Sequence, residues 1–430
     1  MIRFVDLFAG TGGIRLGFQM ACSSLGIESH CVFSSEIDDD ACASYLLNFN
    51  ENPKCDIREV DSLPPFDFLL AGFPCQAFSY AGKRKGFGDT RGTLFFEIER
   101  LLDKYRPKGF LLENVRGLIT HDGGKTFETI INCLERLGYT VEYRLLNSCN
   151  YGVPQNRVRL YIVGLRDSQV KLSIESDLGP SDSHAFKQHK SESSLFATEE
   201  KVFSTISEIL EAEVPEQYYC SKTFEKQLIN AIGPDLSKLH GCRLIDYRGG
   251  QAIHSWDLGL KGVCSDDEKL LMSLLVSNRR KKIFGDHQDG KALSKEQIST
   301  FYVKDNLDEV LLSLLIKGYI SCKEGKYNPV AGNMSFEVFK FLDPDSISTT
   351  LTASDTNRLG VVQGGRPRRI TPREAARIQG YPDSYKLIDK DRAVYKQMGN
   401  GVSVPVIKAV ITDYLTLNPI VSQNALKNEK

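Results

Sequence analysis

Residues Phe66–Tyr80 read FDFLLAGFPCQAFSY, a stretch that predicts a strand followed by a loop with a cysteine. Phe66–Ala71 is a short apolar run, which is typical of a buried strand, and Gly72 ends it. Pro74 then stiffens a loop that places Cys75 just beyond the strand. In an open parallel sheet, ligands bind outside the carboxyl ends of the strands. Cys75 therefore lies where a nucleophile would lie, although most free cysteines are simply small buried apolar residues.

The composition is that of an ordinary globular protein with no strong overall charge. The 430 residues are 41% hydrophobic and 25% charged with a net charge of −1, so a nucleic-acid partner would need a local basic surface. This length predicts two domains, or one large domain with insertions. The eleven cysteines contain no C-x-x-C pair, which predicts no metal site and a reducing intracellular environment. No signal peptide or long apolar run is visible, so we expect no membrane segment.

A glycine loop follows the first predicted strand. Ile2–Phe8 is apolar, Phe8–Gly13 read FAGTGG, and a helical pattern begins at Ile14. Glycine lets the backbone approach a ligand closely, so this order favours a cofactor loop, although glycine turns are common elsewhere. The second predicted strand, His30–Ile37, carries Glu36 near its end, where nucleotide-binding folds hold ribose hydroxyls. Loop and carboxylate together favour an adenosine-type ligand.

Two neighbouring strands are predicted to direct polar side chains to one edge of the sheet. Phe66–Ala71 leads to Cys75, and Gly109–Leu112 leads to Glu113. Because the carboxyl ends of adjacent parallel strands meet at one edge, we expect Cys75 and Glu113 to lie close together. Asp56, in a short connection, could accept a hydrogen bond from an adenine amino group, or could simply form a turn.

Two polar stretches are candidates for contact with an anionic substrate. The first, Tyr80–Thr93, is rich in glycine and predicts a loop that closes over the substrate, or a solvated basic loop. Its cations are Lys83, Arg84, Lys85 and Arg91. In the second, Gln155, Arg157 and Arg159 alternate and would share one face of a strand, which suits phosphate and base-edge contacts or a charged edge strand.

The middle of the chain loses the alternating strand–helix pattern. We expect a catalytic and cofactor-binding core over 1–169, a second domain over 170–345, a return segment over 346–418 that completes the core, and a loose tail over 419–430. Within the second domain, three predicted helices and a hairpin over 266–330 resemble a winged helix. One of these helices ends in a basic run, which would be a DNA-facing patch or merely a charged helix end. The run comprises Arg279, Arg280, Lys281 and Lys282.

An ordered set of motifs resembles the cytosine-C5 DNA methyltransferase family. The set is FAGTGG at Phe8–Gly13, Glu36, Asp56, FPCQAFS at Phe73–Ser79, ENV at Glu113–Val115, QNRVR at Gln155–Arg159, TPREAARIQGYP at Thr371–Pro382 and QMGNGVSVPV at Gln397–Val406. The resemblance covers about residues 1–165 and 346–415, and 170–345 corresponds to the family's variable target-recognition region. It implies an α/β fold, with a Rossmann-like S-adenosylmethionine-dependent methyltransferase sheet and a smaller inserted target-recognition domain.

The resemblance also implies which residues hold S-adenosylmethionine. They are Phe8, Ala9, Gly10, Thr11, Gly12, Gly13, Glu36, Ile37, Asp56, Ile57, Pro74, Leu94, Asn400 and Val402. Glu36 would hold the ribose, and Asp56 with Ile57 would contact the adenine. The family often has an aromatic residue where this chain has Ile37, so a stacking contact there is not implied.

The implied chemistry requires residue types that the chain provides. The implied catalytic set is Cys75, Gln76, Ser79, Glu113, Arg157 and Arg159. C5 of cytosine is a poor nucleophile until a thiolate adds to C6, which requires Cys75 with a pKa lowered from about 8.5. Glu113 would protonate N3 if desolvation raises its pKa. Arg159 would hold O2 of the base and Arg157 a neighbouring phosphate, while the cytosine is flipped out of the duplex.

The function implied is that of a DNA (cytosine-5-)-methyltransferase from a prokaryotic restriction–modification system. We expect a cytoplasmic monomer that acts on double-stranded DNA, with a cognate restriction endonuclease acting separately. The alternatives are a tRNA methyltransferase of the same fold, disfavoured by the long segment 170–345, and a silent DNA-binding relative, disfavoured by intact Cys75 and Glu113. A dinucleotide oxidoreductase would share the glycine loop and Glu36 but would have no use for Pro74-Cys75.

Overall fold

The computed structural model describes residues 1–74, 94–178, 204–246, 252–286, 290–330, 336–418 and 420, which form two compact units. Unit 1 comprises Met1–Ile209, Ile347–Thr356 and Pro372–Lys430, and unit 2 comprises Leu210–Ser346 and Asn357–Thr371. The domain boundaries in the structure differ from the predicted ones. Residues 357–371 were expected in the return segment, but they pair with strands of unit 2 and belong to that unit. None of the helices in the described ranges is long and apolar enough to cross a membrane.

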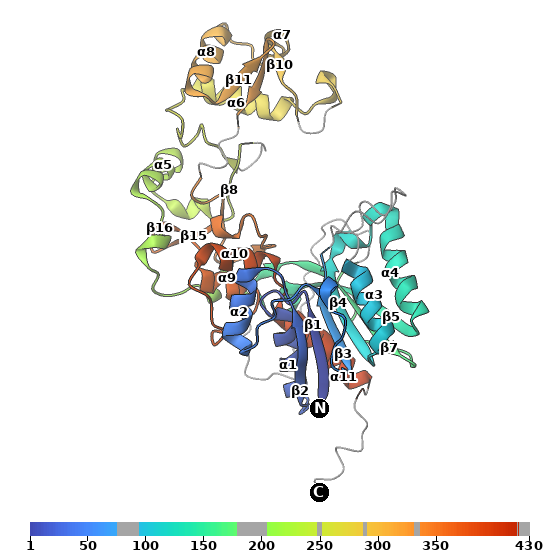
Figure 1. The fold of residues 1–430 in the computed structure, drawn as a ribbon. Helices are drawn as coiled ribbons and strands as arrows, with labels where there is room; N and C mark the ends of the chain where they lie inside the picture. The colour runs from blue at the N-terminus through green and yellow to red at the C-terminus, as the bar shows by residue number, and fades with distance from the viewer. Residues whose placement is uncertain are drawn as a thin grey trace. The chain divides into compact units, whose positions relative to one another are not determined.

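Unit 1 is built on a six-stranded sheet whose first four strands are parallel (Figure 1). In sheet order the strands are β2 (Ser29–Ser35), β1 (Ile2–Leu7), β3 (Phe68–Gly72), β4 (Gly109–Val115), β7 (Val158–Arg166) and β5 (Tyr139–Asn147). Strand β7 runs antiparallel to both of its neighbours, β4 and β5. The central strands β3 and β4 are buried almost throughout, as expected for parallel strands covered on both faces. The predicted α/β fold is confirmed.

Helices cover both faces of this sheet. The helices of unit 1 are α1 (Gly13–Ser24), α2 (Asp39–Phe49), α3 (Leu94–Tyr105), α4 (Lys125–Arg136), α11 (Val404–Leu417) and, packed on each other, α9 (Pro372–Ile378) and α10 (Asp391–Asn400). One core forms under α3 and α4, and the other forms under α1 and α11. A Cβ atom on Gly17 of α1 would lie 2.7 Å from Cβ of Ile407, so α11 packs closely on α1. The expected return of the C-terminal helix to the first core is therefore confirmed.

Short elements complete unit 1. They are η1 (Ile57–Glu59), η3 (Arg116–Leu118), η4 (His121–Gly124), η5 (Ser148–Tyr151), η6 (Ile206–Ile209) and the two-stranded parallel pair of β6 (Gln155–Asn156) with β14 (Ser348–Thr349). The β6–β14 pair joins segments almost 200 residues apart in the chain, which ties the C-terminal part of the sequence to the N-terminal sheet.

Unit 2 contains two sheets, each with its own core. The first has the order β16 (Arg366–Arg369), β15 (Leu359–Gln363), β13 (Lys340–Phe341), β8 (Arg243–Leu244) and β9 (Ala252–Ile253), with α5 (Lys222–Ile232) and the short turns η7 (Glu216–Tyr218), η8 (Leu236–Leu239) and η11 (Thr356–Arg358) nearby in the chain. The second is antiparallel, in the order β10 (Leu293–Ser294), β12 (Lys326–Pro329) and β11 (Ile320–Lys323). Helices α6 (Asp266–Asn278), α7 (Lys295–Ser299) and α8 (Leu307–Lys317) and the turn η9 (Lys282–Phe284) accompany it.

The elements predicted to resemble a winged helix are present in the expected order. Three helices precede a hairpin that turns at Glu324–Gly325, and both of these residues have a positive φ. Capping boxes at Ser265 and Ser294 begin α6 and α7. The structure adds β10, which pairs with β12; its two residues are too few to show as a strand in the sequence.

Two elements of unit 2 are short. Within Phe336–Leu342 only Lys340–Phe341 form a strand, because only these residues have ladder partners in β15. Helix α7 ends at Ser299. The amides of Thr300 and Phe301 donate to carbonyls three residues back, which tightens the last turn and ends the helix.

Candidate cofactor and active site

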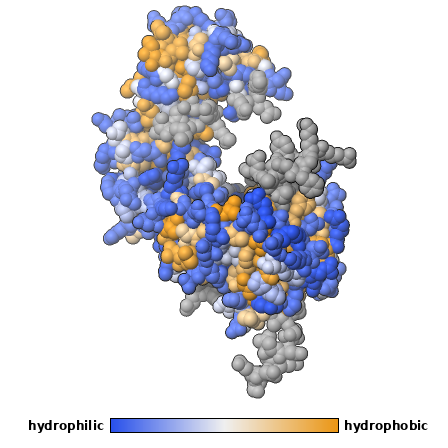
Figure 2. All heavy atoms as spheres, viewed as in Figure 1, coloured by the Kyte–Doolittle hydropathy of each residue, from blue (hydrophilic) through white to orange (hydrophobic). Residues whose placement is uncertain are grey.

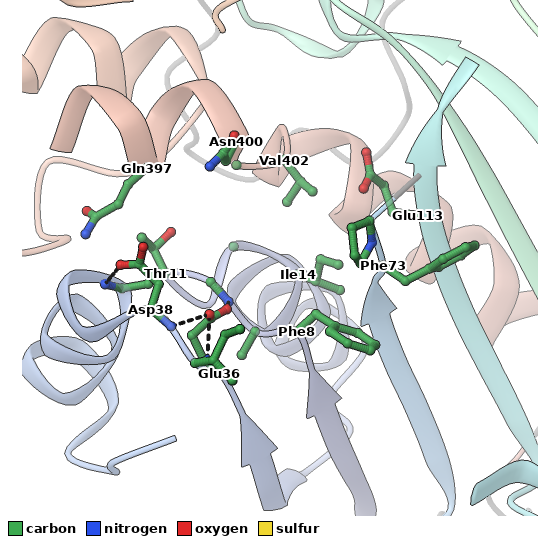
Figure 3. Close-up of a pocket in the computed structure, with 18 of the residues that line it drawn as sticks. Phe8, Thr11, Ile14, Glu36, Asp38, Phe73, Glu113, Gln397, Asn400 and Val402 are labelled. Carbon is green, nitrogen blue, oxygen red and sulfur yellow. Dashed lines mark hydrogen bonds between the residues drawn. The ribbon is translucent and has the colours of Figure 1, made fainter. Parts of the chain in front are cut away.

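A cavity of about 830 Å³ opens in unit 1 at the carboxyl ends of the parallel strands (Figure 3). Its walls come from the loops after β1, β2 and β3, from η1, from the end of β4 and from the turn after α10. The predicted site residues that line it are Phe8, Ala9, Gly10, Thr11, Gly13, Glu36, Ile37, Asp56, Ile57, Pro74, Leu94, Glu113, Arg157, Arg159, Asn400 and Val402. Residues from eight separate segments of the chain therefore meet in one place, as the sequence predicted.

Gly12 belongs to the glycine loop but does not line the cavity. It precedes α1 with a φ of 80°, a left-handed conformation that glycine adopts without strain. A Cβ atom there would also lie 2.2 Å from Cε2 of Phe49. Gly12 is therefore needed for the turn and for packing against α2, and its predicted contact with a cofactor is not a cavity contact in this structure.

Glu36 holds the glycine loop and the start of α2 together. Its Oε2 accepts a hydrogen bond of 2.8 Å from the amide of Gly10, and its Oε1 accepts from the amides of Ile37 and Asp38 at 2.7 and 2.8 Å. A carboxylate has about four acceptor positions, so the oxygen that faces Gly10 can also accept from a ribose hydroxyl. The position of Glu36 beside the loop fits the ribose-binding role expected from the sequence.

The residues expected at an adenine ring lie beside Glu36, because Glu36 pairs with Lys54 two residues before Asp56. Ile37 is 63% exposed and offers an open apolar surface. Asp56 accepts a hydrogen bond of 2.9 Å from Nε of Arg58, and this guanidinium holds the pKa of Asp56 below its usual range. An ionised Asp56 is an acceptor for an amino group. Ile57 is buried beside it and Leu94 is half-buried, so this part of the wall is apolar apart from this carboxylate.

Two tyrosines that the sequence reasoning did not single out hold the glycine loop from the C-terminal side. The hydroxyl of Tyr381 lies 2.8 Å from Oγ1 of Thr11, and the hydroxyl of Tyr385 donates to the carbonyl of Thr11 at 2.6 Å. The two rings pack edge to face with centroids 4.7 Å apart. Tyr381 is the penultimate residue of the TPREAARIQGYP motif, so the motif indicated this segment but not the contact.

The last turn of α10 brings a further polar group to the cavity. Gln397 lines the cavity and accepts a hydrogen bond of 3.0 Å from Ser44 of α2 at its Oε1. Its Nε2 is buried and has no hydrogen-bond partner within the described part of the chain. A buried amide donor without a partner costs stability unless a ligand accepts from it. This donor, which the sequence reasoning missed, suits a ligand that carries oxygen acceptors.

Glu113 and Arg159 form the polar end of the cavity. Glu113 lies in β4, in register with Gly72 of β3, and is 9% exposed. Nε of Arg159 lies 3.4 Å from its Oε1. Burial raises the pKa of Glu113, while Arg159 and Arg157 oppose that shift without cancelling it. The expectation that desolvation raises this pKa is therefore confirmed.

The segment with the predicted nucleophile lies outside the described residues. It contains Cys75, Gln76, Ser79, Lys83, Arg84, Lys85 and Arg91. The structure does place Pro74, the residue before Cys75, in the wall of the cavity. Because β3 and β4 are adjacent and parallel, the chain leaves β3 at the same edge of the sheet that carries Glu113.

Gln155 does not face solvent, which corrects the prediction that it contacts DNA. It is fully buried; its Nε2 donates to the carbonyl of Ile378 and to Gln379, and its Oε1 accepts from the amide of Leu351. Arg157 is 2% exposed and donates to the carbonyls of Leu351 and Gly401, yet it also lines the cavity. The returning chain therefore holds Arg157 at the cavity wall, and its expected contact with a phosphate stays a prediction.

The basic run in unit 2 also needs one correction. Arg280, Lys281 and Lys282 are exposed after the end of α6. Arg279 is only 7% exposed, and a Cβ atom on Gly290 would lie 2.5 Å from its Nε, so Arg279 packs against its own unit. The predicted contact of Arg279 with DNA is therefore wrong for this conformation, and the prediction stays open for the other three.

The sheet, the loops and the cavity together define a class of protein. A parallel sheet with a glycine loop after β1, a carboxylate after β2 and a cavity at the strand ends is a nucleotide-cofactor fold of the Rossmann type. A buried carboxyl with a raised pKa beside an arginine, next to the cavity, is the kind of group that active sites contain.

Comparison with known proteins then identifies the family. Residues 2–415 match the family model of C-5 cytosine-specific DNA methylases, and the chain belongs to this family. It is 58% identical over 429 residues to the Type II methyltransferase M.BanI of Aneurinibacillus aneurinilyticus, covering 99% of each chain. It is 59% identical over 413 residues to the Type II methyltransferase M.HgiCI of Herpetosiphon aurantiacus, covering 96% of this chain and 97% of the relative.

Solved structures support the fold. The crystal structure of S. pombe Dnmt2 methyltransferase superposes with a TM-score of 0.51 at 17% identity, covering 97% of this chain and 99% of that chain. The structure of Entamoeba histolytica methyltransferase EhMeth gives a TM-score of 0.52 at 19% identity, covering 97% and 98%. The sheet of unit 1 is therefore the methyltransferase fold that the sequence predicted, and family and fold together imply the use of S-adenosylmethionine.

The contact between Tyr385 and Thr11 can be tested by its effect on the cofactor. Tyr385→Phe removes one hydrogen bond to the glycine loop, and we expect KM for S-adenosylmethionine to rise about fivefold with little change in kcat. Steady-state kinetics of methyl transfer at saturating DNA measures both. Tyr143→Phe, on the edge strand β5 and 37% exposed, is the matched control and should change neither constant. A fall in kcat at unchanged KM would contradict a role in positioning the loop.

Proposed function

We propose that this protein is the modification enzyme of a Type II restriction–modification system, and that it methylates C5 of a flipped cytosine in a specific duplex sequence through a covalent bond between Cys75 and C6. The observation that carries the proposal is the buried Glu113 with its raised pKa beside Arg159, at the edge of the sheet where β3 ends and where Pro74, the residue before Cys75 in the sequence, lines the cavity. We further propose that it acts in the cytoplasm as a monomer, with the cognate endonuclease as a separate protein.

The residues of the large cavity fit S-adenosylmethionine, which would supply the methyl group. Glu36 would accept from the ribose hydroxyls, and Asp56 from the adenine amino group, while Ile37 and Leu94 would enclose the base. The buried Nε2 of Gln397 would donate to an oxygen of the amino-acid part. These contacts orient the cofactor and make no bond to the transferred group.

Glu113 would act as the acid at N3 of the target cytosine. The raised pKa keeps a proton on Glu113 at a higher pH than an exposed glutamate would allow, so the proton is available when the thiolate adds to C6. As the S–C6 bond forms, the C5–C6 π pair moves to C4–C5, and the C4–N3 π pair moves onto N3 and takes up this proton. Arg159 lies beside Glu113 and would donate to O2 of the same ring, where charge also accumulates.

Methyl transfer and release of the enzyme then follow from the electron count. S-adenosylmethionine, held by the cavity residues, would supply the methyl group to the ring, which is now enamine-like at C5. The N3 proton then returns to Glu113, and loss of the C5 proton to solvent restores the C5–C6 double bond and expels the Cys75 thiolate, so acid and nucleophile are both regenerated. None of these bonds can form inside a stacked duplex, so the base must be flipped out at a cost of a few kcal/mol. The segment over 80–93, with its four cations, would close on the flipped state.

We propose that unit 2 reads the target sequence. The surface of its winged-helix-like part limits which of its elements can contact the DNA backbone. Helix α8 exposes Asp308 and Glu309 in its first turn, then Leu312 and Ile316 at 60% and 78% exposure. Figure 2 shows hydrophobic side chains over the part of the unit where Figure 1 labels α8. An acidic and apolar helix face cannot neutralise phosphates. Contact with the DNA backbone in this part would therefore come from the exposed cations that follow α6.

A duplex with 5-fluorocytosine at the target position tests the covalent step. Fluorine cannot leave C5 as the proton does, so the bond between Cys75 and C6 should persist after methyl transfer. We expect a denaturant-stable protein–DNA adduct that requires S-adenosylmethionine and whose DNA-modified peptide contains Cys75 by mass spectrometry. The same duplex with cytosine is the control and should give no stable adduct. An adduct at another cysteine, or methylation without any adduct, would contradict the proposed mechanism.

A further inference from the structure

Two cations stand directly opposite each other in the five-stranded sheet of unit 2. Arg243 of β8 and Lys340 of β13 are antiparallel partners. Directly opposed residues of an antiparallel pair project to the same face, with Cβ atoms about 4.5–5.5 Å apart, and like charges in this arrangement are destabilising. Packing within the free protein therefore does not explain why two cations are placed opposite each other.

The opposite face of the same strands carries the core of this sheet. Leu244 and Phe341, the next residues along β8 and β13, are 1% and 0% exposed and belong to one apolar cluster. Because successive side chains of a strand alternate between faces, Arg243 and Lys340 project away from that cluster. Both are half-buried rather than fully exposed.

No counter-charge among the described residues compensates this pair. Within the described part of the chain, neither side chain forms an ion pair or a hydrogen bond, whereas Lys295, Lys304 and Lys317 of the same unit are paired with carboxylates. Burial, and then the charge of Arg243, lower the pKa of Lys340 to about 8. A half-buried lysine with a cation opposite and no carboxylate is a costly arrangement in the free protein, and a bound anion would relieve it.

We propose that Arg243 and Lys340 clamp a backbone phosphate of the DNA duplex. The proposal rests on the proposed function, in which unit 2 contacts DNA. The guanidinium of Arg243 can donate two parallel hydrogen bonds to phosphate oxygens, and the ammonium of Lys340 adds a point charge. Such a contact carries no sequence information; it would fix the register of unit 2 on the duplex so that other side chains can read bases.

The salt dependence of duplex binding tests this contact. Each phosphate contact contributes about 0.9 to the slope of log affinity against log salt concentration, so Lys340→Gln and Arg243→Gln should each lower that slope, by roughly 0.9 if the contact is lost. We expect roughly tenfold weaker binding at physiological salt, with equal loss for target and non-target duplexes. Fluorescence anisotropy with labelled duplexes measures both. KM for S-adenosylmethionine should stay unchanged, because both residues belong to unit 2.

Two further variants separate a phosphate clamp from a structural role. Lys226→Gln removes an exposed lysine of α5 from the same unit and should leave the salt slope unchanged. Lys340→Met keeps the aliphatic stem and removes the charge opposite Arg243, so we expect a thermal midpoint no lower than that of the parent together with weakened DNA binding. A stable Lys340→Met protein with parental DNA affinity would show that the pair has no role in binding.

The outcomes distinguish this proposal from the proposed function. If the parent protein binds duplex DNA and both glutamine variants keep its affinity and salt slope, the clamp is wrong and the proposed function stands. If the variants lose affinity for the target duplex alone, the pair reads sequence and the backbone contact is wrong. If the parent protein itself does not bind duplex DNA, both proposals are wrong.

Discussion

Cys75→Ser is expected to abolish methyl transfer to duplex DNA while leaving DNA binding intact. A serine hydroxyl is far less acidic than a thiol, so at neutral pH it supplies almost no anion to add to C6. The rate should fall by at least about 10⁴-fold, because loss of a nucleophile removes the whole covalent path and not one contact within it. Transfer of label from S-adenosylmethionine into duplex DNA measures the rate, and anisotropy measures binding.

The chain offers a matched control for this substitution. Cys322 is exposed in the hairpin of unit 2, so Cys322→Ser makes the same chemical change far from the cavity in sequence and should keep the parental rate. Substantial turnover by Cys75→Ser would contradict the assignment of Cys75 as the nucleophile. A loss of activity in Cys322→Ser as well would show that the assay reports general damage.

Glu113→Gln should slow methylation by roughly 10²–10⁴-fold, the usual range for a lost acid–base group. Glutamine keeps the shape of the side chain but has no proton to give to N3. Because burial raises the pKa of Glu113, the parental rate should fall as pH rises through that pKa, and this alkaline limb should be absent in the variant. Initial rates between pH 5 and pH 9 measure both effects.

The pH dependence of the free energy of unfolding separates a chemical role of Glu113 from a structural one. A raised pKa means that the folded protein binds this proton more tightly than the unfolded chain, so the stabilisation is present below the unfolded pKa and is lost as pH rises through the folded pKa. At neutral pH the substitution therefore removes a buried group that is unfavourable when ionised. Glu142→Gln, half-buried on the edge strand β5, is the control and should keep its rate. A near-parental rate for Glu113→Gln would remove Glu113 from the mechanism.

Local chemistry explains which parts of the site the sequence could reveal. The glycine loop, Glu36 after β2 and Glu113 on β4 each follow an apolar strand, and the carboxyl ends of parallel strands share one edge of the sheet. The position of such a residue along the chain therefore fixes its place in space. This is why residues from distant segments could be assigned to one cavity before the structure was known.

Contacts made across the returning chain could not be predicted in the same way. Gln155 and Arg157 alternate as a ligand-binding face would, but their partners are Leu351, Ile378 and Gly401, nearly 200 residues or more away. No local pattern shows that the returning chain holds both side chains.

The same limit applies to residues that the sequence reasoning missed. Two of the missed features depend on how α9 and α10 pack: the hydrogen bond between Tyr381 and Thr11, and the unpartnered donor of Gln397. The opposed positions of Arg243 and Lys340 depend on strand register. Each of these is a tertiary property. A two-residue strand such as β8 or β13 also leaves no periodic signal in the sequence.

The most direct test of the central claim is methyl transfer from labelled S-adenosylmethionine to duplex DNA and to tRNA in parallel, followed by bisulfite sequencing of the DNA. We predict label in the duplex alone, at cytosine C5 within one short recurring sequence, which would also reveal the target. Label only in tRNA would contradict the assignment of duplex DNA as the substrate. Absence of label from both, with the cofactor still bound, would contradict the proposed activity and indicate a silent DNA-binding relative.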